Sequence, residues 1–268
     1  MGSKTTARVL TIANQKGGVG KTTTAINLAT ALAAIGKKVL IIDLDPQGNA
    51  STGLGIERKE RKISTSDMIR GEATLEQTVI ATAVPNLYVS TSTLDLLGIE
   101  MEIANDSDRA FKLKKAIEEY NPMSFDYILI DCPPSLNLLT INAMAAAHAL
   151  LVPLQTEFFA LEGLSQLLET MREVQTSVNS ELELHGIILT MFDKRNNLAS
   201  QVESDVREFM GEKVYKTVIP RNVRLSEAPS HGKPAILYDI KCSGSQAYLQ
   251  LASEIIRKEN RIAEAKQL

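Results

Sequence analysis

One stretch decides the fold: Lys16-Gly17-Gly18-Val19-Gly20-Lys21-Thr22-Thr23. It follows the apolar run 8–13, which favours a strand, and it precedes residues 22–35, whose apolar spacing favours a helix ending at Gly36. A glycine-rich loop between a strand and a helix can aim several backbone N–H groups at one point, and the helix N-terminus adds a partial positive charge. The sequence therefore predicts a phosphate-binding loop.

Individual residues of this loop carry specific chemistry. Lys21 provides a point charge for the β- and γ-phosphates, and the hydroxyl of Thr22 is a suitable Mg²⁺ ligand. The usual spacing G-x-x-x-x-G-K-[ST] would place a glycine at position 15, but this chain has Gln15 there and a second lysine, Lys16, inside the loop. The predicted nucleotide-binding residues of the loop are Gln15, Lys16, Gly17, Gly18, Val19, Gly20, Lys21, Thr22 and Thr23.

The rest of the chain alternates apolar runs with helical patterns. We predict strands at 8–13, 38–42, 87–89, 127–130, 149–153, 186–190 and 214–219, and helices at 22–35, 110–120, 161–177, 198–209 and 245–265. Several strands are continuous apolar runs, which is typical of strands buried on both faces. The pattern predicts a doubly wound α/β fold: a mostly parallel central sheet, helices on both faces and ligands at the carboxyl ends of the strands.

Composition narrows the class of protein. The 268 residues carry a net charge of −3, which argues against a protein that coats nucleic acid over its whole surface. The two cysteines fit a reducing compartment, and no apolar run reaches the length of a membrane span. We expect a flexible N-terminus at residues 1–6, a single P-loop ATPase domain at 7–268, and a cytoplasmic protein.

Three carboxylates are placed for a metal or nucleotide site. Asp43 and Asp45 follow one buried strand directly, and Asp131 ends another in the Walker B manner. Asp131 is expected to hold Mg²⁺ directly or through water, and Asp43 to lie near the same ion with Thr22. The alternative for Asp43 and Asp45 is a pair of turn residues, because Asp and Pro also favour turns.

The loop resembles the deviant Walker A motif of the ParA/MinD ATPases. Asp131-Cys132-Pro133-Pro134-Ser135 resembles that family's second switch segment, and the resemblance extends from Ala7 to about Ala252. It implies that ATP and Mg²⁺ are the cofactors. It also implies that Lys16 reaches across a nucleotide-sandwich dimer to the partner's phosphates. Lys16, Lys21 and Asp45 would then be catalytic, with Asp45 positioning the attacking water.

The same resemblance suggests two further sites. It implies that Pro220 and Asn222, which follow the strand predicted at 214–219, contact the adenine base. In Soj-like members, arginines matching Arg195 and Arg224 bind DNA without sequence preference. From composition alone, basic loops such as these fit a solvated surface equally well.

The resemblance implies a ParA/Soj-type chromosome partitioning ATPase. Such a protein is a homodimer in the ATP state, binds non-specific double-stranded DNA on the nucleoid and is stimulated by a ParB-type centromere-binding protein. One alternative is an ATPase of the same fold that positions another cargo. A second is a MinD-like membrane-associated regulator, which the mixed charges of residues 257–268 disfavour. A third is an iron–sulfur reductase, which needs more thiolates than Cys132 and Cys242.

Overall fold

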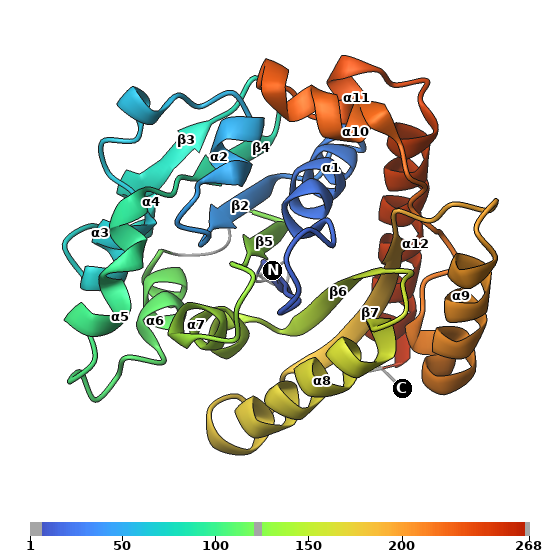
Figure 1. Cartoon of the computed structure of the whole chain (residues 1–268). Helices are drawn as coiled ribbons and strands as arrows, with labels where there is room; N and C mark the ends of the chain where they lie inside the picture. The colour runs from blue at the N-terminus through green and yellow to red at the C-terminus, as the bar shows by residue number, and fades with distance from the viewer. Residues whose placement is uncertain (1–6, 121–124, 266–268) are drawn as a thin grey trace.

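A computed structural model describes residues 7–120 and 125–265, so the N-terminus predicted to be flexible lies outside the described residues. A seven-stranded sheet in the order β3-β4-β2-β5-β1-β6-β7 crosses the molecule (Figure 1). Every neighbouring pair is parallel except β3 with β4. The predicted mostly parallel sheet is confirmed. Its strands are β1 (Arg8–Ile12), β2 (Val39–Asp43), β3 (Val79–Ala81), β4 (Leu87–Ser90), β5 (Tyr127–Asp131), β6 (Ala149–Gln155) and β7 (Glu183–Thr190).

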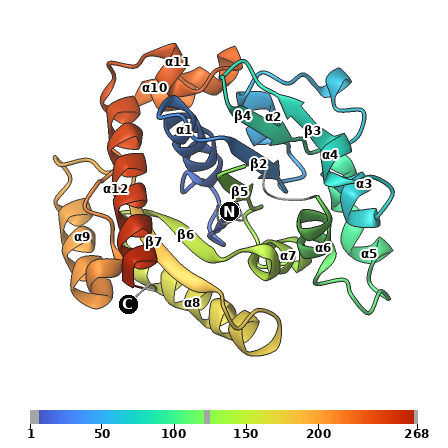
Figure 2. The ribbon, with the colours of Figure 1, turned by 180° about the vertical axis from the view of Figure 1, so that it is seen from behind.

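Helices cover both faces of the sheet. Successive residues of a strand point to opposite faces, and the two faces have separate apolar cores. Leu10 and Ile12 pack with helices α1 (Lys21–Ala34) and α12 (Ser243–Ala265), whereas Val9 belongs to the core on the other face. Figures 1 and 2 show α12 alongside α1 and β7. The doubly wound architecture is therefore as predicted.

The second core is covered mainly by helices from the middle of the chain, among them α6 (Lys112–Glu119), α7 (Leu138–Ala146) and α8 (Ala160–Ser177). In the described part of the chain, no helix is long and apolar enough to cross a membrane. The remaining helical elements are α2 (Asn49–Gly53), η1 (Arg58–Glu60), α3 (Thr65–Arg70), α4 (Leu75–Thr78), η2 (Leu94–Leu97), α5 (Ile99–Glu102), α9 (Asn197–Met210), η4 (Gly211–Lys213), α10 (Val223–Glu227), η5 (Ala228–His231) and α11 (Ala235–Tyr238).

The helix after the phosphate loop ends as its sequence predicts. Gly36 adopts the left-handed conformation with φ 86°. Its N–H donates to the carbonyl of Ala33, and the N–H of Lys37 donates to the carbonyl of Leu32. These two bonds form a Schellman motif, which satisfies carbonyls that the end of a helix would otherwise leave unpaired.

The strand predicted at 214–219 is wrong. Only Val214 forms an isolated bridge there, to Ile187 of β7. The backbone N–H groups of Lys216 and Thr217 instead donate to the carboxylate of Glu254 on α12, at 2.8 and 2.9 Å. Tyr215 and Ile219 still donate backbone N–H groups to the carbonyls of Ile187 and Leu189 on β7. Glu254 takes the N–H of Thr217 between them, so the segment runs beside β7 without forming a continuous ladder.

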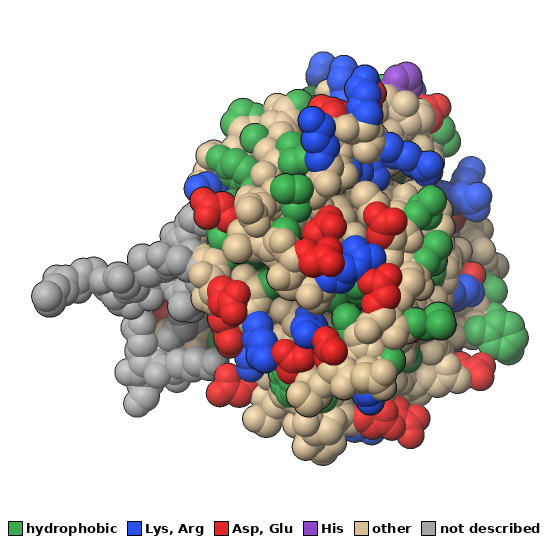
Figure 3. Space-filling view, turned by 90° about the vertical axis from the view of Figure 1, so that its left-hand side faces the viewer, with side chains coloured by type: hydrophobic (Ala, Val, Ile, Leu, Met, Phe, Trp, Pro, Cys, Tyr) green, Lys and Arg blue, Asp and Glu red, His purple; other side chains and the backbone are tan. Residues whose placement is uncertain are grey.

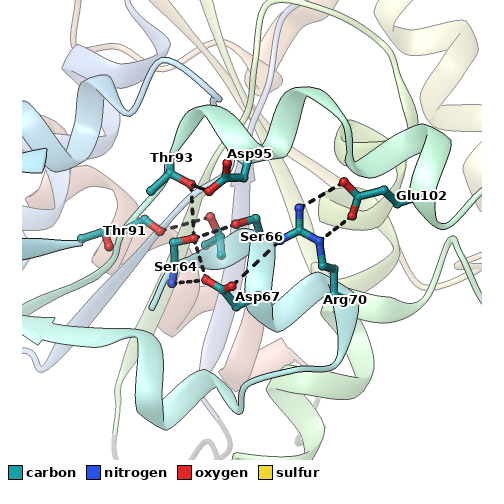
Figure 4. Close-up of polar contacts among 9 residues, drawn as sticks. Ser64, Ser66, Asp67, Arg70, Thr91, Thr93, Asp95 and Glu102 are labelled. Carbon is teal, nitrogen blue, oxygen red and sulfur yellow. Dashed lines mark hydrogen bonds and ion pairs between the residues drawn. The ribbon is translucent and has the colours of Figure 1, made fainter. Parts of the chain in front are cut away.

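Polar contacts connect α3 with the residues that follow β4 and with α5 (Figure 4). Ser64 caps α3 through a reciprocal capping box with Asp67. Arg70, near the end of that helix, binds Glu102 on α5 and also lies within 3.9 Å of Asp67. These groups satisfy one another, so we assign the cluster a structural role.

Candidate functional site

The predicted phosphate loop lines a cavity of about 340 Å³. Strands β2 and β5 end in Asp43 and Asp131, and Asp45 and Pro134, which follow these strands, line the cavity, as expected for a site at the carboxyl edge of a parallel sheet. The volume falls in the range of small-molecule pockets. The lining residues are Gly17, Gly18, Gly20, Lys21, Thr22, Thr23, Asp45, Gln47, Asn49, Pro134 and Met191.

The loop owes its shape to two glycines and two polar anchors. Gly18 and Gly20 adopt left-handed conformations, with φ 77° and 90°, which residues with a Cβ rarely adopt. The hydroxyl of Thr190, at the end of β7, donates to the carbonyl of Val19 at 2.8 Å. The side chain of Asn14 donates to the carbonyl of Pro153 and accepts from the N–H of Lys16. The loop is therefore held from β6 and β7.

Lys21 is buried at the floor of the cavity, 7% exposed. Its ammonium donates to the carbonyl of Lys16 at 3.0 Å. Burial lowers the pKa of Lys21, while the nearby Asp131 and Asp45 oppose that change. The ammonium of Lys21 is buried and only partly neutralised by carboxylates in the nucleotide-free chain, so it is suited to bind an anionic phosphate.

Lys16 points away from this floor. Its ammonium forms an ion pair with Glu157, which lies between β6 and α8. The neighbouring Gln15 donates to the side chain of Gln166 on α8. Neither Gln15 nor Lys16 lines the cavity, so in this state both side chains bind the chain's own β6–α8 region.

Two of the predicted metal ligands are adjacent but differ in their bonding. Asp43 and Asp131 lie in register on β2 and β5, and both are fully buried. Asp43 accepts from the N–H of Asp45 and from the N–H and hydroxyl of Ser51. Neither oxygen of Asp131 makes a hydrogen bond of good geometry to a described residue, although the hydroxyl of Thr22 lies near the carboxylate. Burial raises the pKa of both carboxyls, and the hydroxyl of Thr22 opposes the rise at Asp131.

This bonding allows a test of the predicted Mg²⁺ site. Two buried oxygens without partners, close to the hydroxyl of Thr22, fit a site where a cation or its bound water compensates Asp131. No cluster of three or more His, Cys, Asp or Glu side chains in residues 7–120 and 125–265 could hold a metal. Mg²⁺ usually binds through one or two protein groups plus phosphate oxygens and water. Thr22 and Asp131 fit the ion, whereas both oxygens of Asp43 already accept hydrogen bonds from protein donors.

Asp45 lines the cavity and is 8% exposed. One of its carboxylate oxygens accepts from the N–H of Gln47 at 3.0 Å. Its backbone carbonyl accepts from the hydroxyl of Ser92 at 2.6 Å. The residue is thus fixed by its backbone, with its side chain at the cavity wall.

Cys132 lies next to Asp131 in the core and is fully buried. Its sulfur is 3.2 Å from the hydroxyl of Thr11, and burial raises the pKa of the thiol to about 12. A buried thiol with a raised pKa behaves as a small apolar residue.

The structure does not bring the predicted adenine-contacting residues to the cavity wall. Pro220 forms an isolated bridge with Phe192, which follows the wall residue Met191. The side chain of Asn222 caps α10 by accepting from the N–H of Arg224, and it donates to Ser243. Neither predicted residue lines the cavity, and Pro220 is linked to its wall through Phe192, the neighbour of Met191.

The predicted DNA-binding arginines are exposed but paired with acids. Arg195 is 89% exposed and binds Asp193, while Arg224 binds Glu227 and lies 3.6 Å from Asp239. Their segments meet at the bridge between Phe192 and Pro220. On the face with α3 and β3, Lys and Arg gather along the upper edge and alternate with Asp and Glu below (Figure 3). The region below the upper edge is therefore not a continuous basic surface.

Sequence reasoning missed two residues that shape the cavity. Met191 lines it in a left-handed conformation with φ 51°, which is uncommon for a residue with a side chain. Thr190 supports the loop from 171 positions away. No local pattern signals either residue, because both depend on how β7 meets the phosphate loop.

Comparisons with known proteins identify the family of the chain. A family model described as an AAA domain matches residues 7–184. The chain is 58% identical over 253 residues to the chromosome partitioning protein ParA of Caulobacter vibrioides, covering 94% of this chain and 95% of that protein. It is 52% identical over 248 residues to the sporulation initiation inhibitor protein Soj of Bacillus subtilis, covering 92% and 98%.

A solved structure provides a further comparison. Cobyrinic acid a,c-diamide synthase from Mycobacterium smegmatis, with a bound ATP analogue and magnesium, superposes with a TM-score of 0.81 at 33% identity. The match covers 95% of this chain and 96% of that one. Binding of ATP and magnesium is therefore a property of this fold family.

Proposed function

Because the chain belongs to the ParA/Soj family of ATPases, we propose that it is a chromosome partitioning ATPase that dimerises when it binds Mg-ATP. In this proposal the dimer binds DNA without sequence preference, and a ParB-type centromere-binding protein stimulates hydrolysis. The 58% identity to a chromosome partitioning protein over nearly the whole chain favours this reading over an ATPase that positions another cargo or a MinD-like membrane regulator.

One observation carries the proposal: a single loop contains two lysines with opposite orientations. Lys21 is buried at the cavity floor, where it can bind phosphate of its own nucleotide. Lys16 extends outward to Glu157, and its side chain is 44% exposed. An exposed lysine in a phosphate loop cannot serve the same phosphates from that position, but it can reach those of a second copy.

The chemistry follows from positioned charges. Backbone N–H groups of residues 17–23 and the ammonium of Lys21 are proposed to bind the phosphates. Thr22 and Asp131 would hold Mg²⁺, which when bound neutralises charge on phosphate oxygens. Asp45 is proposed to orient the attacking water from the cavity wall. The carboxylate of Asp43 is proposed to support Asp45 by accepting a hydrogen bond from the backbone N–H of Asp45. Pro220 and Asn222 are proposed to contact the adenine base after residues 191–192 move away from the cavity wall.

DNA binding is proposed to depend on dimerisation. Arg195 and Arg224 are each paired with an acid, so these two residues present little free positive charge on one chain. Two copies would double the number of weak phosphate contacts, and linked weak contacts gain through effective concentration. ATP would therefore switch DNA binding on, and hydrolysis would switch it off.

A DNA retention assay tests this function. We expect the wild-type chain to retain a random-sequence duplex with ATP and Mg²⁺ but not with ADP. Combined Arg195→Ala and Arg224→Ala substitutions should abolish retention and leave ATP-dependent dimerisation intact. Equal retention with ATP and ADP would reject the switch, and retention by the double variant would reject the choice of arginines.

A further inference from the structure

The ion pair between Lys16 and Glu157 involves a carboxylate oxygen with no other partner. Oε1 of Glu157 is covered by the Lys16 ammonium and makes no hydrogen bond to another described group, while the Glu157 side chain as a whole is 31% exposed. The ion pair with Lys16 is therefore the contact that this carboxylate makes in the described chain. Release of Lys16 leaves the carboxylate to water or to another cation.

The backbone of Lys16 is fixed, so only its side chain is free to change direction. Its N–H donates to Asn14, and its carbonyl accepts from Lys21. The preceding Gln15 is tied to Gln166 on α8. A movement of the Lys16 side chain can thus occur without disturbing the loop.

An exposed aromatic pair adjoins this ion pair. Phe158 and Phe159 directly follow Glu157 and are 74% and 63% exposed. Their rings contact each other edge to face, with centroids 5.1 Å apart. Adjacent exposed aromatic rings indicate an interaction surface. The patch is continuous with the lysine that is proposed to reach a second copy, and a two-fold dimer places the same patch on both copies.

This inference rests on the proposed function, in which Lys16 reaches a second copy. We propose that Glu157 is a positioning residue that holds Lys16 on its own protomer until ATP binds, and that Phe158 and Phe159 pack against the second copy once Lys16 is released. Glu157 then opposes dimerisation of the nucleotide-free chain, while the aromatic pair favours the dimer.

The ion pair sets the size of the expected effect. Partly exposed ion pairs change an equilibrium by about 1.4- to 5-fold, and two must break in a dimer, so the combined effect is about 2- to 25-fold. Glu157→Gln should therefore strengthen ATP-dependent dimerisation by that factor in sedimentation velocity. Glu162→Gln on α8 is the control, because it removes an equal charge from an exposed residue without an ion pair among the described groups.

A double-mutant cycle separates positioning from a general charge effect. In a Lys16→Ala background, Glu157→Gln should no longer alter association, since no ammonium remains to be held. An equal effect in both backgrounds would overturn the positioning role. So would a Glu157→Gln chain that dimerises like Glu162→Gln, or less readily.

The aromatic pair is tested by Phe158→Ser combined with Phe159→Ser. We expect at least a tenfold loss of ATP-dependent dimerisation while a fluorescent ATP analogue still binds. Phe209→Ser on α9, where the ring is 66% exposed, is the matched control. Unchanged dimerisation would overturn the docking role, and single substitutions replace the double variant if it does not fold. If the wild-type chain fails to dimerise with ATP, the proposed function itself fails; if it dimerises and these variants match their controls, only this inference fails.

Discussion

Asp43 and Asp131 face each other in register on adjacent parallel strands, yet within residues 7–120 and 125–265 only the carboxylate of Asp43 accepts hydrogen bonds of good geometry. The two residues are close in the structure and identical in chemistry, so the difference arises from their neighbours: the N–H of Asp45 and Ser51 of α2 donate to Asp43. We interpret Asp43 as the support of the site and Asp131 as the residue that receives the cation.

Substitution of these two residues should therefore separate stability from activity. Asp131→Asn replaces a buried carboxylate that has no hydrogen-bond donor of good geometry among the described residues, so the free energy of unfolding should stay equal or rise, while Mg²⁺-dependent hydrolysis falls about tenfold or more. Asp43→Ala leaves Ser51 and Asp45 donors unsatisfied and should cost about 2 kcal/mol or more in stability. Urea unfolding without nucleotide measures the stability. If Asp131→Asn destabilises the chain as much as Asp43→Ala does, this division of roles is wrong.

Thr190 should affect ATP binding although it does not line the cavity. Thr190→Val removes the 2.8 Å hydrogen bond to Val19 and with it a support of the phosphate loop. We expect KM for ATP to rise about 2- to 10-fold, in line with the loss of one hydrogen bond.

The control for this prediction is Thr30→Val on α1. The hydroxyl of Thr30 is also buried and also donates over 2.8 Å, to the carbonyl of Ile26. It should lower stability by a similar amount without changing KM. Equal KM values for the two variants would show that Thr190 contributes only to folding.

Acid should destabilise the chain through two histidines, His185, which is buried, and His148, which is half-buried. Burial lowers the pKa of His148 and of His185, although Glu259 opposes the change at His185. A histidine whose pKa is lowered on folding binds fewer protons in the folded chain than in the unfolded one. Stability is therefore present above the unfolded pKa, about 6.5, and is lost as the pH falls below it.

Urea titrations at about pH 7.5 and pH 5.5, on either side of that value, measure this effect. We expect the combined His148→Gln and His185→Gln variant to lose less stability between these pH values than the wild type does. His231→Gln, at an exposed position, should leave the difference unchanged. A double variant with the wild-type pH dependence would place the acid sensitivity elsewhere.

DNA binding, if it uses Arg195 and Arg224, should depend on salt in a defined way. The slope of log K against log salt should become less negative by about 0.9 for each phosphate contact removed. Arg172→Ala on α8 is the control, because that residue is exposed and α8 lies at the opposite end of the molecule from α10 (Figures 1 and 2). A slope unaffected by Arg195→Ala and Arg224→Ala, or one equally affected by Arg172→Ala, would assign DNA binding to other residues.

Much of the sheet and the phosphate loop could be predicted, because their signals are local. The glycines and lysines of the loop lie between an apolar strand and a periodic helix in one continuous stretch of sequence. This pattern can be recognised without knowing which strands pair in the sheet. Helix α7 was not predicted because Leu138–Ala146 is apolar nearly all round and lacks a helical period. The three residues of β3 are too few to show alternation.

The errors have a different origin. The segment 214–219 has the apolar content of a strand, but Glu254 binds its N–H groups from 37 and 38 positions away. Thr190 and Glu157 likewise act on the loop through long-range contacts. Local patterns locate the chemistry of the site, whereas the supports of that chemistry depend on tertiary packing.

The central claim is that ATP bound to one chain becomes part of an interface with a second through Lys16. Sedimentation velocity of the wild-type chain and of Lys16→Ala, each with ATP and Mg²⁺, tests it most directly. We predict that ATP converts the wild-type chain from monomer to dimer and that Lys16→Ala still binds ATP but stays monomeric. A Lys16→Ala chain that dimerises at the same ATP concentration as the wild type would contradict the claim.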